Sequence, residues 1–294
     1  MLNKNPDFKA GYVMLLGPPN AGKSTLLNQI LDFRLSIVTT KPQTTRKNVL
    51  GILNGGAYQV ILIDTPGLIV PKYALQSMLM RYIERSLQDA DMIIYLVDVT
   101  SAIGSVGIQL LRADKPVILA LNKIDLIDKR NILSLIDQYR KIFNFSAYVP
   151  VSALKKNGLQ DLLEEVVNRL PVHPPFFPPD YLTDEPERFF VSEIIREKIF
   201  ELYSQEIPYA CHVSIEEFIE KKGAKDYIRA VIFVDQLSRK GILIGKNGRA
   251  LRKVGEQARQ DIEKFLGRPV YLELYVKVIS DWRKNSLKLK SLGY

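Results

Sequence analysis

The stretch from Gly17 to Ser24 has the residue types and the spacing that are needed to wrap around a phosphate chain. It matches G-x-x-x-x-G-K-[ST] and lies between an apolar run at 12–16 and a helix-like run at 24–31. Glycines let the backbone approach phosphates closely, and the N–H groups of the loop and helix N-terminus then point at the oxygens. Lys23 can reach the β- and γ-phosphates, and the Ser24 hydroxyl can ligate Mg²⁺. The candidates for nucleotide binding here are Gly17, Pro18, Asn20, Ala21, Gly22, Lys23, Ser24 and Thr25.

Two further segments could complete the metal side of such a site. Asp64-Thr-Pro-Gly67 follows the apolar run at 58–63, where a carboxylate can hold Mg²⁺ and the Gly67 N–H can meet the γ-phosphate. A threonine in the segment 41–46 can ligate Mg²⁺ when GTP is bound, and we prefer Thr45, with Thr44 as the alternative. The metal candidates are therefore Ser24, Thr45 and Asp64, and the catalytic candidates are Lys23, Thr45 and Gly67.

The pattern Asn122-Lys-Ile-Asp125 indicates which base is recognised. Asp125 can accept two hydrogen bonds from guanine, whereas adenine offers no such pair of donors. We expect Asn122 to tie this loop to the phosphate loop and the stem of Lys123 to cover the base. After the run at 147–151 come Ser152, Ala153 and Leu154, of which the Ala153 N–H can donate to guanine O6. Together these motifs predict a site for GTP and GDP with Mg²⁺.

The segments that must position these motifs alternate short apolar runs with helix-like stretches. The apolar runs are at 12–16, 48–53, 58–63, 92–97, 117–121 and 147–151. Strands that are apolar on both faces and alternate with helices are typical of parallel sheets. We therefore expect a doubly wound α/β domain, of the P-loop GTPase type, over residues 1–170.

A second domain is expected after a Pro-rich stretch. Prolines prevent the segment at 170–179 from continuing a helix or joining the interior of a sheet, so we place an extended linker at 171–186. Residues 187–294 then show a helix at 189–202, strands at 211–215 and 227–234, two helical segments around Gly245, and a strand at 271–278. This order predicts a small α+β unit, in which Trp282 could stack on a base or cover the end of the sheet.

A G-x-x-G turn between the two helical segments points to RNA. Its glycines permit a tight turn. The apolar run before the turn can form one wall of a groove for bases, and basic side chains follow the turn. This is the pattern of a KH module, which clamps about four nucleotides of single strand. The RNA-binding candidates are Ile242, Ile244, Gly245, Lys246, Asn247, Gly248, Arg249, Arg252 and Lys253.

The charge distribution agrees with a polyanion partner for the second domain. Residues 221–294 contain 18 Lys or Arg and 7 Asp or Glu, whereas residues 1–220 contain 23 and 25. One cysteine excludes an internal disulfide framework and fits a reducing compartment. The chain has no apolar run near the roughly 18 residues of a membrane span and no secretory signal at its start. We expect a cytoplasmic protein and leave peripheral attachment to a membrane open.

The chain resembles the Era family of GTPases over nearly its whole length. The segments that carry the resemblance are G-x-P-N-A-G-K-S-T at 17–25, K-P-Q-T-T-R at 41–46, D-T-P-G-L at 64–68, N-K-I-D at 122–125, S-A-L at 152–154, I-G-K-N-G at 244–248 and S-L-G-Y at 291–294. The segment at 99–112 is shorter than is typical of the family. The resemblance implies a type II KH domain and a role in assembly of the small ribosomal subunit.

The partners that the resemblance implies are the 3′ end of small-subunit ribosomal RNA and the assembling small subunit, together with peripheral association with the inner face of the membrane. We expect a monomer. Two other functions remain open: a GTPase of the tRNA-modification type, and an RNA chaperone with a regulatory nucleotide site.

Two residues bear on the rate of hydrolysis. Leu68 stands where many GTPases have a glutamine that orients the attacking water, so we expect slow intrinsic hydrolysis. In related GTPases an asparagine at the position of Asn20 helps to bind K⁺, which implies K⁺ as a further cofactor and faster hydrolysis in K⁺ than in Na⁺.

Overall fold

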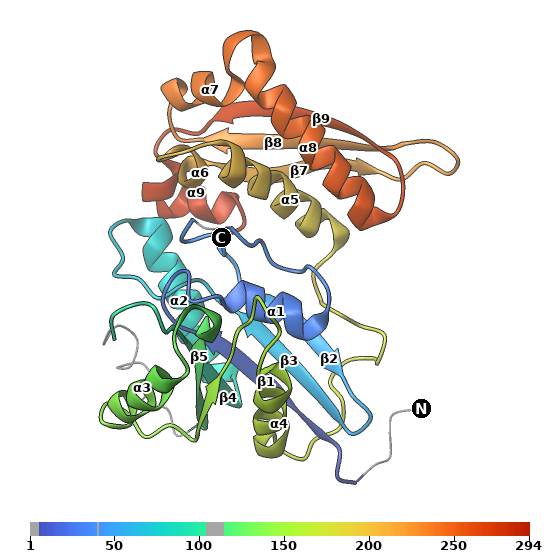
Figure 1. The fold of residues 1–294 in the computed structure, drawn as a ribbon. Helices are drawn as coiled ribbons and strands as arrows, with labels where there is room; N and C mark the ends of the chain where they lie inside the picture. Colours follow the sequence, from blue (N-terminus) through green and yellow to red (C-terminus); the bar gives the residue numbers. More distant parts are fainter. Residues whose placement is uncertain (1–5, 40, 104–114) are drawn as a thin grey trace. The chain divides into compact units, whose positions relative to one another are not determined.

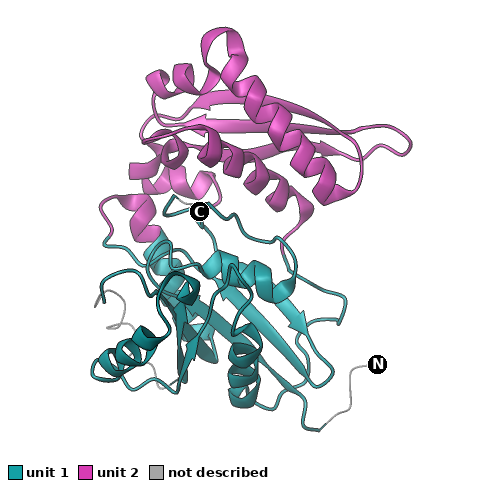
Figure 2. Cartoon of the chain, in the orientation of Figure 1, with its two compact units in different colours: residues 1–70, 79–184 teal, residues 71–78, 185–294 magenta. Residues whose placement is uncertain are grey.

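The computed structural model describes residues 6–39, 41–103 and 115–294. The chain forms two compact units, residues 1–70 with 79–184, and residues 71–78 with 185–294 (Figure 2). Most of the segment at 99–112, which the sequence suggests is short, lies outside the described residues.

The first unit is built on a six-stranded sheet with helices on both faces (Figure 1). The strand order is β2-β3-β1-β4-β5-β6. The strands are β1 (Lys9–Leu16), β2 (Val49–Asn54), β3 (Tyr58–Asp64), β4 (Met92–Asp98), β5 (Val117–Asn122) and β6 (Ala147–Pro150). The helices are α1 (Lys23–Leu31), α3 (Arg130–Arg140), α4 (Leu159–Arg169) and most of α2 (Ala74–Asp89), whose residues up to 78 are assigned to the second unit.

Five of the strands run parallel, and the sixth, β2, does not. The expectation of a wholly parallel sheet was therefore wrong. β2 pairs antiparallel with β3, with Val49 opposite Asp64. Only three residues, 55–57, connect the two strands, and such a short connection can form a hairpin but not a crossover. As a result β2 begins at the edge of the sheet where the parallel strands end.

The hydrophobic core forms because strand alternation sends apolar side chains to both faces. Met14 and Leu16 of β1 belong to one buried cluster that also contains Ile83 of α2 and Ile136 of α3. On the other side, α1 packs on β2 and β3, and α4 packs on β5 and β6. The carboxyl ends of the parallel strands therefore meet at one edge, which is where ligands bind in open α/β sheets.

The Pro-rich segment is anchored along the first unit. The buried amide of Gln59 accepts from the N–H groups of Phe176 and Phe177, and it donates to Phe177 O and to Asn54 Oδ1. Farther along, the N–H of Ile52 on the edge strand β2 donates to the carbonyl of residue 182 at 2.8 Å. The extended backbone at 171–184 thus covers a sheet edge that would otherwise present free N–H and C=O groups.

The second unit has a three-stranded sheet in the order β7-β8-β9. Its strands are β7 (His212–Ile219), β8 (Asp226–Val234) and β9 (Val270–Val278), and its helices are α5 (Glu187–Leu202), α6 (Ile207–Ala210), α7 (Leu237–Ile244), α8 (Arg249–Leu266) and α9 (Ser286–Ser291). The predicted order of major elements is confirmed, because α5, β7, β8, α7, α8 and β9 follow one another, with the short α6 and a 3₁₀ turn at Lys246–Gly248 between them.

One face of this sheet carries the core of the second unit. Apolar residues of β8 and β9 pack there against α5, α7 and α8, whose inward positions include Ile195, Leu243, Val254 and Ile262. Trp282 is completely buried, donates to Ala210 O and packs beside His212. Of its two expected roles it therefore has the structural one. Within the described residues, no helix is long and apolar enough to cross a membrane.

The anchoring of the Pro-rich segment predicts a large effect of Gln59→Leu. The substitution leaves two N–H groups of the segment without their buried acceptor, and each such loss costs about 1–3 kcal/mol. We expect guanidinium unfolding to show a loss of roughly 2–4 kcal/mol in the first unit, with faster proteolysis between 171 and 184. Gln160→Leu on the exposed surface of α4 is the matched control, and equal stability of the two variants would contradict the anchoring role.

Candidate functional site

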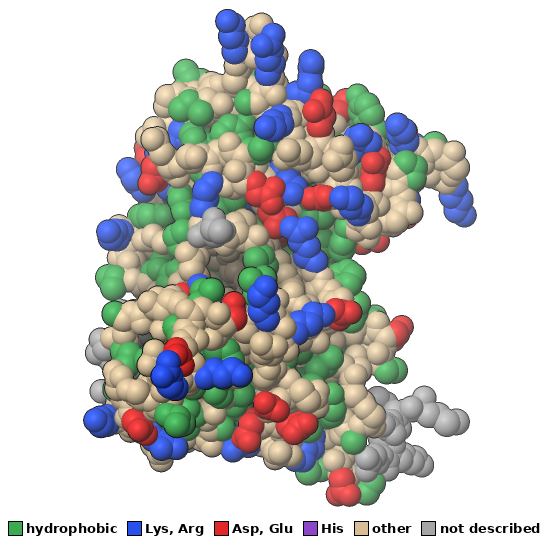
Figure 3. All heavy atoms as spheres, viewed as in Figure 1, with side chains coloured by type: hydrophobic (Ala, Val, Ile, Leu, Met, Phe, Trp, Pro, Cys, Tyr) green, Lys and Arg blue, Asp and Glu red, His purple; other side chains and the backbone are tan. Residues whose placement is uncertain are grey.

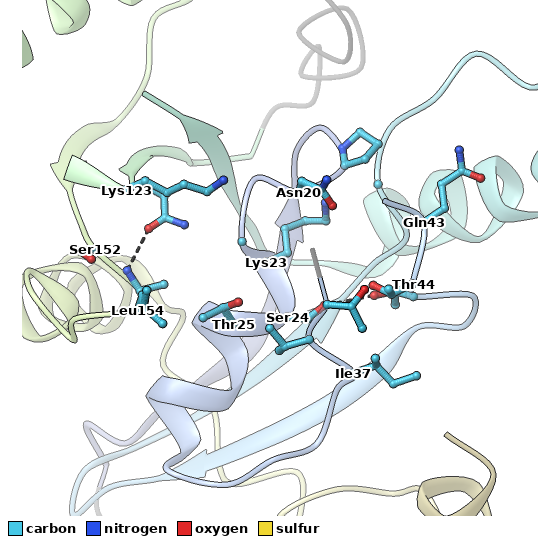
Figure 4. Close-up of a pocket in the computed structure, with 18 of the residues that line it drawn as sticks. Asn20, Lys23, Ser24, Thr25, Ile37, Gln43, Thr44, Lys123, Ser152 and Leu154 are labelled. Atoms are coloured by element: carbon cyan, nitrogen blue, oxygen red, sulfur yellow. Dashed lines mark hydrogen bonds between the residues drawn. The ribbon is translucent and has the colours of Figure 1, made fainter. Parts of the chain in front are cut away.

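A cleft of about 500 Å³ lies at the carboxyl edge of the six-stranded sheet. Residues from all the predicted nucleotide motifs line it. Figure 4 shows the order of the parts: Lys123, Ser152 and Leu154 lie on one side, Asn20 and Lys23 lie in the middle, and Ser24 and Thr44 lie on the other side. This order matches a base, a phosphate chain and a metal ion laid in sequence.

The phosphate loop takes its shape from one glycine in particular. Gly17 has φ +154°, and a Cβ there would lie 2.1 Å from Leu96 O of the neighbouring strand, so no larger residue fits. The Lys23 ammonium is buried and donates to Gly17 O and Pro18 O at 3.0 and 2.9 Å. Burial lowers the pKa of Lys23 to about 8, against the opposing charge of Asp64. A phosphate chain would supply the negative charge that this buried ammonium lacks.

Three oxygen-bearing side chains meet on the metal side. Ser24 Oγ donates to Asp64 Oδ2 at 2.7 Å, and Thr45 Oγ1 lies 3.1 Å from Ser24 Oγ and 3.4 Å from Asp64 Oδ2. Thr44 makes no such contact with the pair among the described residues, so the geometry favours Thr45 of the two predicted alternatives.

The environment of Asp64 fits a cation. The carboxylate is completely buried, and its Oδ1 has no hydrogen-bond partner among the described residues. Burial raises the pKa of Asp64, while the Ser24 hydrogen bond and the Lys23 charge act in the opposite direction. A hydroxyl, a second hydroxyl and a carboxylate are ligands that Mg²⁺ accepts together with phosphate oxygens and water. The part of the chain that the structure describes holds no group of three or more His, Cys, Asp or Glu that could form an all-protein metal site.

The base side is organised around the buried amide of Asn122. Its Nδ2 donates to Ala21 O at 2.7 Å, and its Oδ1 accepts from the Ala153 N–H at 2.9 Å. Asp125 accepts from the Ser152 hydroxyl at 2.6 Å, which holds the carboxylate at the mouth of the cleft. The Ala153 N–H, for which the sequence suggests guanine O6 as acceptor, is therefore engaged by Asn122 in this state.

Asp98 is a residue of this site that the sequence reasoning missed. It ends β4 opposite Asn122, and its carboxylate pairs with Lys123 Nζ at 2.6 Å. The Thr100 N–H and hydroxyl also donate to it, at 2.9 and 2.6 Å. Burial would raise the pKa of Asp98, but the hydrogen bonds from Lys123 and Thr100 outweigh burial and hold that pKa below its usual value. The sequence could have indicated Asp98, because this carboxylate directly follows the apolar run at 92–97, and the carboxyl ends of parallel strands are where functional groups gather.

Leu68 and Asn20 have different environments. The Leu68 side chain is 3% exposed and packs in the core cluster that contains Met14 and Ile83. It therefore presents nothing to the cleft that could orient water. Asn20 is exposed, has φ +62° and lines the cleft within the phosphate loop (Figure 4).

The G-x-x-G turn of the second unit joins α7 to α8. Gly245 has φ +70°, and a Cβ there would lie 2.6 Å from the Ala250 Cβ, which explains why glycine is needed. Asn247 and Gly248 also have positive φ. The turn leaves Lys246 and Asn247 exposed, and Figure 3 shows Lys and Arg side chains gathered at this end of the second unit, where Figure 1 shows the connection from α7 to α8.

A groove next to this turn runs between α8 and β9. Among the predicted RNA-binding residues, Gly248 and Arg252 line it. Ile242 is 56% exposed on α7, and Arg249 and Lys253 are exposed on α8, but these three do not line the groove. Residues that the sequence reasoning missed complete the lining: Lys225, Leu251, Gly255, Glu256, Arg259, Val270, Tyr271, Leu272 and Leu274. An apolar floor with cationic walls suits bases and phosphates of a single strand.

Comparison with known families identifies both units. Residues 12–123 match the family described as 50S ribosome-binding GTPase, and residues 206–283 match the KH domain family.

Relatives match the chain over its whole length. GTPase Era of Geotalea uraniireducens is 43% identical over 98% of this chain and 98% of its own. A crystal structure of an Era variant from Aquifex aeolicus bound to GDP and aluminium fluoride has a TM-score of 0.93 at 39% identity, and covers 98% of this chain and 99% of that one. An Era structure in complex with MgGDPNP and nucleotides 1506–1542 of 16S ribosomal RNA has a TM-score of 0.94, with the same identity and coverage.

The ion pair between Asp98 and Lys123 predicts a measurable effect on nucleotide release. We expect Asp98→Asn to speed dissociation of a fluorescent GDP by roughly three- to tenfold, because the Lys123 stem is no longer held. The association rate should stay nearly constant.

A double-mutant cycle separates this role from a general loss of structure. In a Lys123→Ala background the Asp98→Asn substitution should add almost nothing. Asp128→Asn, which breaks an exposed pair with Arg130, is the control. If Asp98→Asn had the same effect with and without Lys123, the proposed positioning role would be wrong.

Proposed function

The chain belongs to the Era family of GTPases, and from that premise we propose that it is a GTP-dependent switch that binds the 3′ end of small-subunit ribosomal RNA and acts in assembly of the small subunit. The observation that carries the proposal is the groove between α8 and β9, which opens beside the G-x-x-G turn in the same chain as a guanine-nucleotide cleft. The relative that was crystallised with 16S ribosomal RNA nucleotides supports the choice of RNA.

The chain hydrolyses GTP, and its own residues suggest how. Lys23 would neutralise charge on the β- and γ-phosphates, and Ser24, Thr45 and Asp64 would hold Mg²⁺, which supplies further neutralisation of the phosphate oxygens when bound. The Gly67 backbone lies at the cleft where the γ-phosphate would end. Because Leu68 is buried in the core, no side chain at that position orients the water, and we infer that intrinsic hydrolysis is slow.

The two binding events are coupled in this proposal. GTP would order the loop that carries Thr45, whose hydroxyl stands within reach of the metal side, and the segment that follows Gly67. If RNA binds the GTP state more tightly, RNA must raise the affinity for GTP by the same factor.

Two other functions are less well supported. A GTPase of the tRNA-modification type does not account for a KH unit that matches its family over residues 206–283. An RNA chaperone with a regulatory nucleotide site would retain RNA release after Lys23→Ala, whereas the switch would lose nucleotide control of release.

We also propose that the protein is a cytoplasmic monomer that associates peripherally with the inner face of the membrane. The support is a completely buried single cysteine, which suits a reducing compartment, and a basic second unit, which suits anionic surfaces. Co-sedimentation of the full chain with anionic vesicles tests the membrane part.

RNA binding should depend on the nucleotide. Labelled RNA from the 3′ end of small-subunit ribosomal RNA should bind tightly with a non-hydrolysable GTP analogue and weakly with GDP. Arg252→Ala should weaken binding and lower the salt slope by about one, because one phosphate contact is lost. Lys284→Ala, at an exposed lysine that does not line the groove, is the control. Equal binding in both nucleotide states would break the proposed coupling.

Hydrolysis should be faster in KCl than in NaCl at matched ionic strength. The physical reason is a K⁺ ion near the transferring phosphate, held in part by the Asn20 amide oxygen at the edge of the phosphate loop. Single-turnover hydrolysis with wild type and Asn20→Ala measures the effect, which should disappear in the variant. Identical rates in both salts would remove K⁺ from the mechanism.

A further inference from the structure

The face of the three-stranded sheet opposite the core carries a row of tyrosines. Strand alternation places Tyr227 on this face of β8, and Tyr271 and Tyr275 on the same face of β9. The two strands pair in parallel register, with Tyr227 opposite Tyr271. Tyr271 and Tyr275 are 54% and 48% exposed, a large share for aromatic side chains on a strand. We call this surface, made of Tyr227, Tyr271 and Tyr275, the tyrosine face.

The rings of the tyrosine face are held in position before any ligand arrives. Tyr271 stacks on Tyr227, with ring centroids 6.0 Å apart and an interplanar angle of 14°. The Tyr227 hydroxyl donates to Glu273 at 2.8 Å, and the Tyr275 hydroxyl reaches the same carboxylate at 3.3 Å. Rings that are already ordered lose little conformational entropy when a planar ligand stacks on them.

The tyrosine face continues the groove between α8 and β9. Tyr271 lines the groove and is also part of the tyrosine face, so it marks the place where the two surfaces join. β9 is an edge strand with β8 as its neighbour in the sheet, so a polymer can pass over this edge from one face to the other. Alternation along a strand puts the Cα atoms of Tyr271 and Tyr275 about 13 Å apart, the length of a few nucleotides.

Two lysines lie close to the tyrosine face. Lys225 lines the groove next to Tyr271, and the Lys221 ammonium lies 6.0 Å from the Tyr227 ring centroid. The surface also has carboxylates: Glu273 accepts hydrogen bonds from two tyrosine hydroxyls, and the neighbouring Arg229 is ion-paired with Glu216 and Glu217. Aromatic side chains combined with cationic ones are the usual platform for successive bases of a single strand.

We propose that RNA leaving the groove crosses the edge of β9 and stacks its next bases on Tyr271 and Tyr275. The inference rests on the proposed function, because it extends the footprint of the same RNA. A KH groove clamps about four nucleotides, so the tyrosine face lengthens the recognised strand and adds affinity that depends little on sequence.

Tyr275→Ala in the full chain is the decisive variant, because Tyr275 does not line the groove. Two RNAs from the 3′ end of small-subunit ribosomal RNA serve as probes: one of roughly five nucleotides that fills the groove, and one extended by about four nucleotides on each side. Tyr275→Ala should weaken binding of the long RNA by roughly five- to 50-fold and leave the short RNA within about twofold. Tyr275→Phe keeps the ring and should bind both RNAs as wild type does.

A fluorescent base reports stacking directly. With 2-aminopurine in the flanking nucleotides, wild type should quench the fluorescence of the long RNA, and Tyr275→Ala should not. Ile219→Ala is the matched control, since Ile219 is an exposed apolar residue of β7 that carries no ring and lies in register with Tyr227.

The outcomes separate this inference from the proposed function. If wild type binds neither RNA, the proposed function fails, and the tyrosine face fails with it. If wild type binds both RNAs but Tyr275→Ala weakens them equally or not at all, the groove stands and the tyrosine face is overturned. A loss for Ile219→Ala as large as that for Tyr275→Ala would mean general apolar contact, which also overturns base stacking.

Discussion

The buried amide of Asn122 is the interaction on which the guanine-nucleotide site depends. It joins the phosphate loop through Ala21 O and the last loop of the site through the Ala153 N–H. A Cβ at Gly22 would lie 2.3 Å from Asn122 Nδ2, so the glycine of the phosphate loop and the asparagine of the base loop require each other. One side chain thus sets the spacing between the loops that read the phosphates and those that read the base.

The site also contains two buried ionisable side chains, Lys23 and Asp64, whose charged forms a bound nucleotide and its metal ion would stabilise. Lys23 is buried with a lowered pKa, and Asp64 is buried with a raised one, both chiefly because burial disfavours their charged forms. Phosphates stabilise the charged lysine, and a cation stabilises the charged carboxylate. Binding of a nucleotide with its metal ion would therefore offset the desolvation cost of both side chains. The Thr45 hydroxyl lies close to Ser24 Oγ, so the loop that carries Thr45 can contact the bound ion.

In the second unit, the strand β9 contributes both to the core and to the proposed RNA-binding surface. The inward residues of β9 form the core with α8, while the strand's free edge and its outward tyrosines remain available to a ligand. Period-two alternation allows one strand to support the fold and a binding surface together. The G-x-x-G turn adds exposed backbone beside that edge, because its positive φ angles stop α7 and start α8 within a few residues.

The family, the nucleotide motifs and the order of the major elements could be predicted from the amino-acid sequence, because each depends on local spacing: glycines at a turn, apolar runs with a strand or helix period, and carboxylates directly after strands. The tertiary structure was needed to show the partnership of Asp98 with Lys123, the contacts of Thr45 with Ser24 and Asp64, and the lining of the RNA groove. Each of these depends on residues far apart in the chain that meet through strand order and register. No local pattern along the chain records such a meeting, because it is packing that selects which side chains face each other.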